Sequence, residues 1–375
     1  MSKMKIVLIG LGGVSEMHLD AYKSISDITI IAGSDISEHR RKFIEDNYKV
    51  KTYCNYLDMI EACPFADLAV VLTPARVHGE VIERVAAKGI NILCEKPLSI
   101  SLEDANKIIS VCKENQVKLF YGASYRYLPA CQKAKKMIEE GLIGKPMLMH
   151  EYVVGGTGIE GFIDLGFHHY PKDGPGGGGL GLCDHGIHLI DLFRWYNKCE
   201  IETISGQVNT SGEKPKTEYL VMKFNNDSIG ILINNEATFS TDMPSEGIFG
   251  KGKAYEWNDS IALENTWHKT PFSIRIHGTE GALRIFPYAN KLYYFNDAGT
   301  VEINDLIDKP APGNFELQMR DILDDLNSIK KSAPTGEDGY KALNALMAGY
   351  ISMKNETVIK LDNGEMLKEN IDALI

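Results

Sequence analysis

Long apolar runs are absent from this sequence of 375 residues. A membrane-spanning helix requires roughly 18 or more consecutive apolar residues, and no stretch of the chain approaches that length. Near the start, residues 6–9 form the one apolar run before Gly10, which is shorter than the hydrophobic region of a secretory signal peptide. We therefore expect neither a membrane span nor an export signal.

The cysteines show no pairing pattern. There are seven of them, an odd number, each stands singly, and no CxxC pair occurs. A disulfide framework normally has an even number of cysteines at conserved-looking spacings. The reducing cytoplasm is therefore the expected compartment.

Positive charge is in deficit. The chain has 40 Lys and Arg against 51 Asp and Glu, which gives a formal net charge of -11. This balance opposes non-specific binding to nucleic acid or to an anionic membrane, so we expect neither as a partner. Apolar residues at 44% and charged residues at 24% are close to globular averages. A globular protein with a small-molecule ligand fits this composition best.

Strand-like runs alternate with helical patterns over roughly the first 122 residues. The expected strands there are residues 5–9, 28–32, 68–72, 90–94 and 118–122. This alternation indicates βαβ units and a doubly wound parallel sheet, whereas consecutive strand-like runs beyond residue 200 favour an antiparallel or mixed sheet. The sequence predicts an α/β protein with domains at 1–124 and 125–375, of which the last helix and strand could pack back on the first domain.

Glycine is the residue in excess, with 35 copies where about 7% is usual. One group lies in the run Gly10-Leu11-Gly12-Gly13-Val14-Ser15, between an expected strand and an expected helix. Such a turn lets a dinucleotide pyrophosphate approach the backbone at a helix N-terminus. Asp35 follows the next strand, where an acid can bind the ribose hydroxyls of NAD and repel the 2'-phosphate of NADP. Gly10, Gly12, Gly13, Val14 and Asp35 therefore predict an NAD site, although Arg40 and Arg41 could soften that preference.

A second candidate site lies at Cys94-Glu95-Lys96-Pro97, which ends an expected parallel strand. Ligands of open α/β sheets bind at this edge. A lysine there, in a cationic or desolvated neighbourhood, could have its pKa lowered enough to exchange protons with a substrate hydroxyl. Taken alone, the same tripeptide could be a surface turn.

These motifs together resemble the Gfo/Idh/MocA family, the relatives of glucose-fructose oxidoreductase and inositol dehydrogenase. The resemblance depends on the glycine turn, Thr73-Pro74 with His78, Glu95-Lys96-Pro97, and Asp184-x-Gly186-x-His188-x-x-Asp191 with Trp195. It implies an N-terminal Rossmann domain and a C-terminal α/β domain with a large, mostly antiparallel open sheet. It further implies a homodimer or homotetramer formed through that sheet, and hydride transfer between NAD and a sugar, amino sugar or polyol.

The resemblance also implies roles for individual residues. Lys96, Asp184 and His188 are the expected catalytic residues, and Thr73, Pro74, His78, Glu95 and Lys96 are expected to join the glycine turn in binding the cofactor. Positions 184 and 188 are spaced i, i+4, so on a helix their side chains face the same way. The ordinary pKa of His188 suits removal of a hydroxyl proton near neutrality, and Lys96 can bind the same oxygen. Either of the two could be the base.

Seven side chains are the expected contacts of the substrate: Lys96, Arg126, His168, His169, Asp184, His185 and His188. Arg126 could instead bind a structural carboxylate. Three features depart from the family pattern, namely Ala75 where Asn is frequent, an imidazole at His185, and a long glycine-rich segment at 155–181. We expect these departures to affect the choice of substrate more than the type of reaction.

Other interpretations of the same residues exist. His168, His169, Cys183, Asp184, His185 and His188 resemble a zinc-binding set, but their spacing matches no standard site, and we expect no metal. A non-catalytic nucleotide-binding regulator is a second alternative, although such proteins usually lose the Lys or the Asp-x-x-x-His pair. A third is a glycosidase-like lyase that oxidises a sugar transiently and then returns the hydride.

Overall fold

The computed structural model describes residues 3–154, 181–211, 214–235, 273–309 and 313–361. The chain forms two compact units. The first contains Met1–Ser124 and Pro312–Leu343, and the second contains Tyr125–Ala311 and Asn344–Ile375. The first unit thus includes a C-terminal stretch that the expected limits of 1–124 and 125–375 assign to the second domain.

The first unit contains a six-stranded sheet in the order β3-β2-β1-β4-β5-β6, in which every neighbouring pair is parallel. Its strands are β1 (Met4–Ile9), β2 (Ile28–Ser34), β3 (Thr52–Tyr53), β4 (Leu68–Val71), β5 (Asn91–Cys94) and β6 (Leu119–Tyr121). The strand order reverses between β1 and β4, which is where doubly wound sheets bind ligands at the carboxyl ends of their strands. The predicted Rossmann sheet is confirmed.

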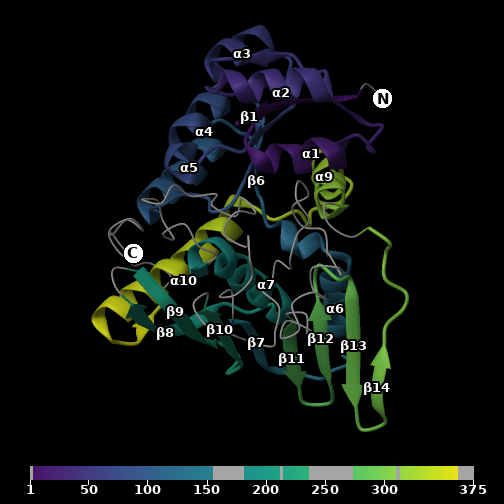
Figure 1. Ribbon diagram of the computed structural model, residues 1–375, viewed down its shortest axis with the longest axis vertical. Coiled ribbons are helices and arrows are strands. Elements are labelled where there is room, and N and C mark those ends of the chain that lie inside the picture. The colour runs from purple at the N-terminus through teal and green to yellow at the C-terminus, as the bar shows by residue number, and fades with distance from the viewer. Residues whose placement is uncertain (1–2, 155–180, 212–213, 236–272, 310–312, 362–375) are drawn as a thin grey trace. The chain divides into compact units, whose positions relative to one another are not determined.

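Six α-helices accompany this sheet: α1 (Gly13–Tyr22), α2 (Glu38–Tyr48), α3 (Tyr56–Ala62), α4 (His78–Ala86), α5 (Leu102–Glu114) and α9 (Gly313–Leu326). Figure 1 shows α1 beside α9, and α4 beside α5. The side chain of Ser37 accepts a hydrogen bond from the Arg40 amide and so caps α2, and Ser101 caps α5 in the same way. β1 crosses the core, because residues 6–8 are fully buried.

The second unit contains a nine-stranded sheet in the order β14-β13-β12-β11-β7-β10-β9-β8-β15. Its strands are β7 (Pro146–Val154), β8 (Ile201–Ser211), β9 (Lys214–Phe224), β10 (Ile229–Asn235), β11 (Ile274–Gly278), β12 (Ala282–Phe286), β13 (Lys291–Asn296), β14 (Gly299–Glu302) and β15 (Ile359–Lys360). Only β10 and β7 pair in parallel among these described strands. The predicted large, mostly antiparallel sheet is confirmed, and the last strand, β15, extends it beside β8.

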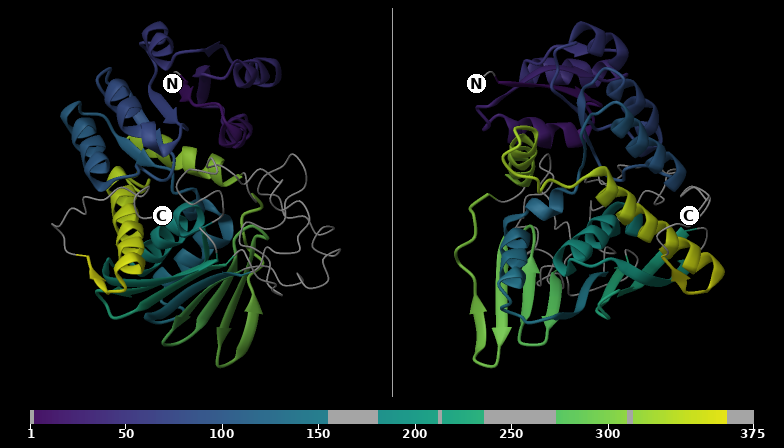
Figure 2. Two further views of the ribbon diagram at one scale, coloured as in Figure 1. Left: turned by 60° about the vertical axis from the view of Figure 1, so that its left-hand side comes forward. Right: turned by 180° about the vertical axis from the view of Figure 1, so that it is seen from behind.

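Helices lie on one face of this second sheet (Figure 2). They are α6 (Pro129–Glu139), α7 (Ile187–Asn197), which follows the π-helix η4 (Gly181–Gly186), and the later part of α10 (Gly336–Asn355). α6 packs against β12 and β13, and α7 packs against β7. Alternate strand residues such as Leu283 and Ile285 are buried, as expected when one face of an antiparallel sheet is covered. α10 belongs to the first unit as far as Leu343 and to the second unit from Asn344 onward.

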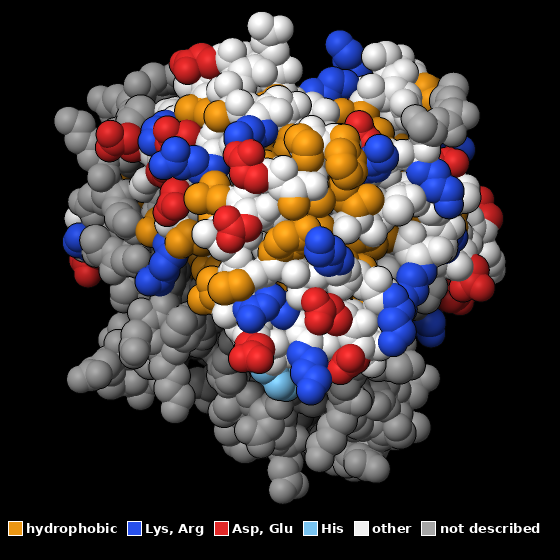
Figure 3. Space-filling model, turned by 90° about the horizontal axis from the view of Figure 1, so that it is seen from above, with side chains coloured by type: hydrophobic (Ala, Val, Ile, Leu, Met, Phe, Trp, Pro, Cys, Tyr) orange, Lys and Arg blue, Asp and Glu red, His pale blue; other side chains and the backbone are white. Residues whose placement is uncertain are grey.

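The sequence did not predict two short strands or the π-helix. β3 has two residues, and all four residues of β14 are exposed, so neither has an apolar alternation to detect. Most of the glycine-rich segment 155–181 lies outside the described residues. Among the described helices, none is both long and apolar enough to cross a bilayer. On the face drawn in Figure 3, basic and acidic side chains are interspersed.

Candidate active site

The glycine turn connects β1 to α1. Gly10 has φ +92°, and a Cβ there would lie 2.8 Å from the carbonyl carbon of Leu72, which directly follows β4. At Gly12 and Gly13 a Cβ would meet nothing within 4 Å. Gly12 precedes the first residue of α1 and provides no side-chain cap. The N-terminus of this ten-residue helix is therefore open to an anionic group, as a pyrophosphate-binding turn requires.

Gly10→Ala tests the turn directly. The added methyl group would overlap the backbone of Leu72 and Thr73, and a positive φ is unfavourable for alanine. We expect a loss of unfolding free energy of about 1–3 kcal/mol together with weaker binding of NADH. Urea unfolding and a fluorescence titration with NADH measure the two effects. Gly89→Ala is the matched control, because Gly89 also has positive φ (+71°) but a Cβ there meets nothing within 4 Å; equal losses in both variants would contradict the expected overlap.

Asp35 lies at the carboxyl end of β2 beside the glycine turn. One carboxylate oxygen accepts a hydrogen bond from the amide of Leu11 and the other accepts one from Ser37, both at 2.7 Å. Arg41 donates to the main-chain oxygens of Asp35 and Ile36. The predicted acid and the predicted glycine turn are therefore joined by a direct hydrogen bond. Ile36, next to Asp35, is 92% exposed.

Thr73, Pro74 and His78 follow β4. The imidazole of His78 is fully buried, and burial lowers its pKa. Its Nε2 lies 2.7 Å from the carbonyl oxygen of Thr73, to which it donates. Its Nδ1 lies 3.2 Å both from the Cys94 thiol and from the carbonyl oxygen of Leu98. Burial raises the pKa of that thiol. His78 thus connects the end of β4 to the end of β5, while its contact with a cofactor stays a prediction.

The hydroxyl oxygen of Thr73, which follows β4, is buried. It has no hydrogen-bond partner among the described residues. Buried polar groups normally have partners. Thr73 therefore fits a position beside a polar ligand, and its role in binding the cofactor stays a prediction.

Glu95 is fixed by residues that the sequence analysis did not identify. Its Oε1 lies 3.1 Å from His18 Nε2, and His18 Nδ1 lies 2.8 Å from the hydroxyl of Tyr22. Its Oε2 accepts the amide of Lys96 at 3.1 Å. A Cβ at Gly122 would lie 2.9 Å from Glu95 Cα, so glycine is required there. One oxygen of the Glu95 carboxylate is thus held by His18 of helix α1, and the other by the amide of Lys96. The family resemblance implies that Lys96 is catalytic.

In the second unit, Asp184 lies in η4 and His188 is the second residue of α7. Both side chains are buried, with residue exposures of 2% and 7%. The imidazole of His188 stacks on the ring of Tyr125, with centroids 4.0 Å apart and an interplanar angle of 7°. The ring orientation of His188 is therefore set by an aromatic neighbour from the start of this unit.

His185 belongs to a buried polar chain next to that stack. Its Nε2 lies 2.8 Å from Oε2 of Glu151 on β7, and its Nδ1 lies 3.4 Å from the hydroxyl of Tyr125. The hydroxyl of Tyr288 donates in turn to that of Tyr125. Glu151 and Tyr288 were not predicted, because they are distant in the sequence and no local spacing points to them. His185, a predicted substrate contact, is 2% exposed and lies within this chain.

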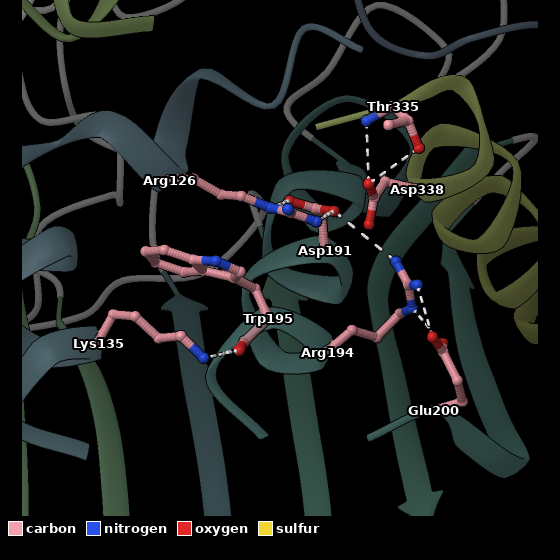
Figure 4. Close-up of polar contacts among 8 residues, drawn as sticks. All are labelled: Arg126, Lys135, Asp191, Arg194, Trp195, Glu200, Thr335 and Asp338. Atoms are coloured by element: carbon pink, nitrogen blue, oxygen red, sulfur yellow. Dashed lines mark hydrogen bonds and ion pairs between the residues drawn. The ribbon is translucent and has the colours of Figure 1, made fainter. Parts of the chain in front are cut away.

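Of the two alternatives for Arg126, the structure shows the pairing with a carboxylate. Its Nε and Nη2 donate to the two carboxylate oxygens of Asp191 at 2.7 and 2.6 Å (Figure 4). The side chains are 9% and 3% exposed. Arg194 lies 3.8 Å from the same carboxylate and forms a bidentate pair with Glu200. Trp195 lies beside this group, with the guanidinium of Arg126 5.8 Å from its ring centroid.

Two predicted substrate contacts, His168 and His169, lie outside the described residues. Within the described part of the chain, no group of three or more His, Cys, Asp or Glu residues could hold a metal ion. All seven cysteines are free thiols.

Comparison with known proteins identifies the relatives of this chain. Residues 4–123 match the model of an oxidoreductase family with an NAD-binding Rossmann fold, GFO/IDH/MocA, and residues 131–284 match the C-terminal domain of the same family. The myo-inositol 2-dehydrogenase of Thermotoga maritima is 25% identical over 96% of this chain and 99% of its own length. The D-xylose 1-dehydrogenase (NADP+) of Haloarcula marismortui is 23% identical over 96% of this chain and 93% of its own length.

Solved structures show the same fold. An oxidoreductase from Agrobacterium radiobacter, determined in complex with NAD+, L-tartaric acid and magnesium, superposes with a TM-score of 0.76 at 19% identity and full coverage of both chains. The sequence matches extend over both units, and the first matched model is that of a Rossmann fold. The chain is therefore an enzyme of the GFO/IDH/MocA oxidoreductase family.

Proposed function

We propose that this enzyme is an NAD-dependent dehydrogenase that oxidises a hydroxyl-bearing carbon of a sugar, amino sugar or polyol. The observation that supports it most is the hydrogen bond between Asp35 and the glycine turn, at the carboxyl end of a Rossmann sheet. An acid at this position favours the free ribose hydroxyls of NAD and repels a 2'-phosphate. The names of the relatives, a myo-inositol and a D-xylose dehydrogenase, support the substrate class.

The residues of the first unit fit a nicotinamide dinucleotide. Gly10, Gly12, Gly13 and Val14 would hold the pyrophosphate at the start of α1, and Asp35 would hold the adenosine ribose. Five more residues would complete the cofactor site: Thr73, Pro74, His78, Glu95 and Lys96. Of these, His78 and Glu95 would act indirectly, because they hold the backbone of Thr73 and of Lys96. When bound, the nicotinamide supplies the acceptor for the hydride of the substrate carbon.

Oxidation of the alcohol also releases the hydroxyl proton. We propose that Lys96 and His188 bind the reacting hydroxyl oxygen and that one of them takes this proton, while Asp184 orients the substrate. The stack on Tyr125 supports His188 in this role, because it fixes the ring of a general base before the substrate arrives. Residues 1–124 would then bind mainly the cofactor, and 125–375 would bind the substrate.

Two further parts of the proposal concern the setting of the enzyme. The outward face of the second sheet has partly exposed apolar residues, including Tyr219, Val221 and Ile231, which supports a homodimer or homotetramer formed through this face. The seven free thiols support a reducing compartment such as the cytoplasm.

A panel of inositols, aldoses and amino sugars, each incubated with NAD or NADP, tests the reaction. We expect an increase in absorbance from NADH in proportion to the substrate oxidised, and a higher kcat/KM with NAD. Turnover without accumulation of NADH, by enzyme that retains its cofactor during purification, would show transient oxidation instead. A clear preference for NADP would overturn the assigned role of Asp35.

A further inference from the structure

Arg40 lies against the glycine turn. Its Nε donates to the carbonyl oxygen of Leu11 at 2.6 Å, and its Nη2 donates to that of Gly12 at 3.3 Å. Asp35 accepts the amide of the same Leu11. The amide of Leu11 is therefore bonded to the carboxylate of Asp35, and its carbonyl oxygen is bonded to the guanidinium of Arg40. Both side chains come from the segment that follows β2.

Glu16 compensates the charge of Arg40. Its Oε1 lies 2.7 Å from Nη2 of Arg40, and the two side chains are 34% and 24% exposed. Glu16 lies in the first turn of α1, and Arg40 lies near the start of α2. The ion pair thus joins the two helices that begin on either side of the proposed adenosine end of the cofactor.

The position of this pair has a chemical consequence for the choice of cofactor. A phosphate monoester carries about -1.5 to -2 charges at neutral pH, and arginine is the side chain best suited to bind one. Arg40 is five residues beyond Asp35, on the same segment. Both arginines donate to main-chain oxygens, Arg41 to those of residues 35 and 36 and Arg40 to those of the glycine turn. Arg40 is the one that lies against the turn, so it is the cation that a 2'-phosphate bound there would use, and its Nη2 is paired with Glu16.

We propose that Glu16 is a second determinant of cofactor choice, which acts by pairing with Arg40 and so withholding its charge from a 2'-phosphate. This inference rests on the proposed function, because it assumes a nicotinamide dinucleotide at the glycine turn. It assigns the rejection of NADP to two carboxylates. Asp35 repels the phosphate directly, and Glu16 neutralises the arginine that would otherwise offset that repulsion.

The test measures binding without any substrate. NADH and NADPH are titrated into wild-type enzyme and into Glu16→Gln, and the ratio of the two dissociation constants is compared. We expect Glu16→Gln to shift this ratio about threefold to tenfold toward NADPH. The reason is that Arg40, once it has lost its partly exposed partner Glu16, can interact with the 2'-phosphate. In Glu16→Gln with Arg40→Gln the shift should vanish, because the cation is gone. The shift should also diminish in 1 M NaCl.

Asp20→Asn is the matched control. Asp20 lies on the same helix and pairs with Lys23, so its replacement removes one charge from α1 without affecting Arg40, and the ratio should not change. An unchanged ratio in Glu16→Gln, or a shift that persists in the double variant, would overturn the inference. Wild-type enzyme that binds neither dinucleotide would overturn the proposed function instead. Wild-type enzyme that prefers NADPH would also overturn the proposed function. The difference in the ratio of dissociation constants between wild type and Glu16→Gln would still test the role of Glu16.

Discussion

Lys96→Met is expected to reduce kcat for NADH production by about 10²- to 10⁴-fold, the usual contribution of a general acid or base. His188→Ala is expected to have an effect of the same order, since it removes the imidazole that stacks on Tyr125. Methionine preserves much of the length and the apolar stem of lysine but cannot bind or take a proton. Steady-state kinetics with the substrate identified by the panel measure the loss, and an NADH titration shows whether cofactor binding is retained.

Lys107→Met provides the control for this prediction. Lys107 is an exposed lysine of the same unit that pairs with Glu83, and its replacement should leave kcat unchanged. Because His188→Ala also removes an aromatic stack, His188→Phe is included, since it keeps an aromatic ring beside Tyr125 but cannot take a proton. Full NADH production by Lys96→Met, or by both His188 variants, would show that the catalytic assignment is wrong.

Asp191→Ala is expected to have the largest effect on stability. The bidentate pair of Asp191 with Arg126 is almost fully buried, so the variant leaves a guanidinium without its carboxylate in the interior of the second unit. Removing one partner of a buried ion pair costs about 3–5 kcal/mol. Arg194 loses a neighbouring carboxylate at the same time. Urea unfolding, followed by tryptophan fluorescence, measures the change.

Two variants separate this cost from other effects of the substitution. Arg126→Met combined with Asp191→Leu removes both charges, and this double variant should be more stable than Asp191→Ala alone. Asp305→Ala removes the exposed partner of Lys133 and should change the unfolding midpoint little. A double variant as unstable as Asp191→Ala would mean that packing, and not the buried charge, determines the loss.

Local patterns explain why the first unit was predictable. The strand and helix periods of residues 4–122 and the glycine turn are encoded over short stretches, and so is the position of Asp35 after β2. The i, i+4 spacing of Asp184 and His188 fits a helix, on which the two side chains face the same way. The apolar pattern did not distinguish the π-helix η4, which contains Asp184, from an α-helix.

Contacts over long sequence separations were not predictable. His18 meets Glu95 at a separation of 77 residues, and Tyr125 meets Tyr288 at a separation of 163. One sequence contains no information that pairs such positions, because each residue alone is compatible with an ordinary core or surface place. Arg126 illustrates the same limit, since its type fitted both a substrate and a carboxylate until Asp191 was found against it.

The discontinuity of the first unit has a consequence for how the chain is made. α9 packs on α1, and the ring of Phe315 lies 4.5 Å from that of His18. During synthesis, a chain that has emerged only to residue 124 contains every strand of the first sheet but not this helix. Domains generally fold as units and in order of emergence. Here the buried face of α1 around His18 is covered only after residues 313–326 have been made, so all strands of the Rossmann sheet are synthesised long before the unit that contains them is complete.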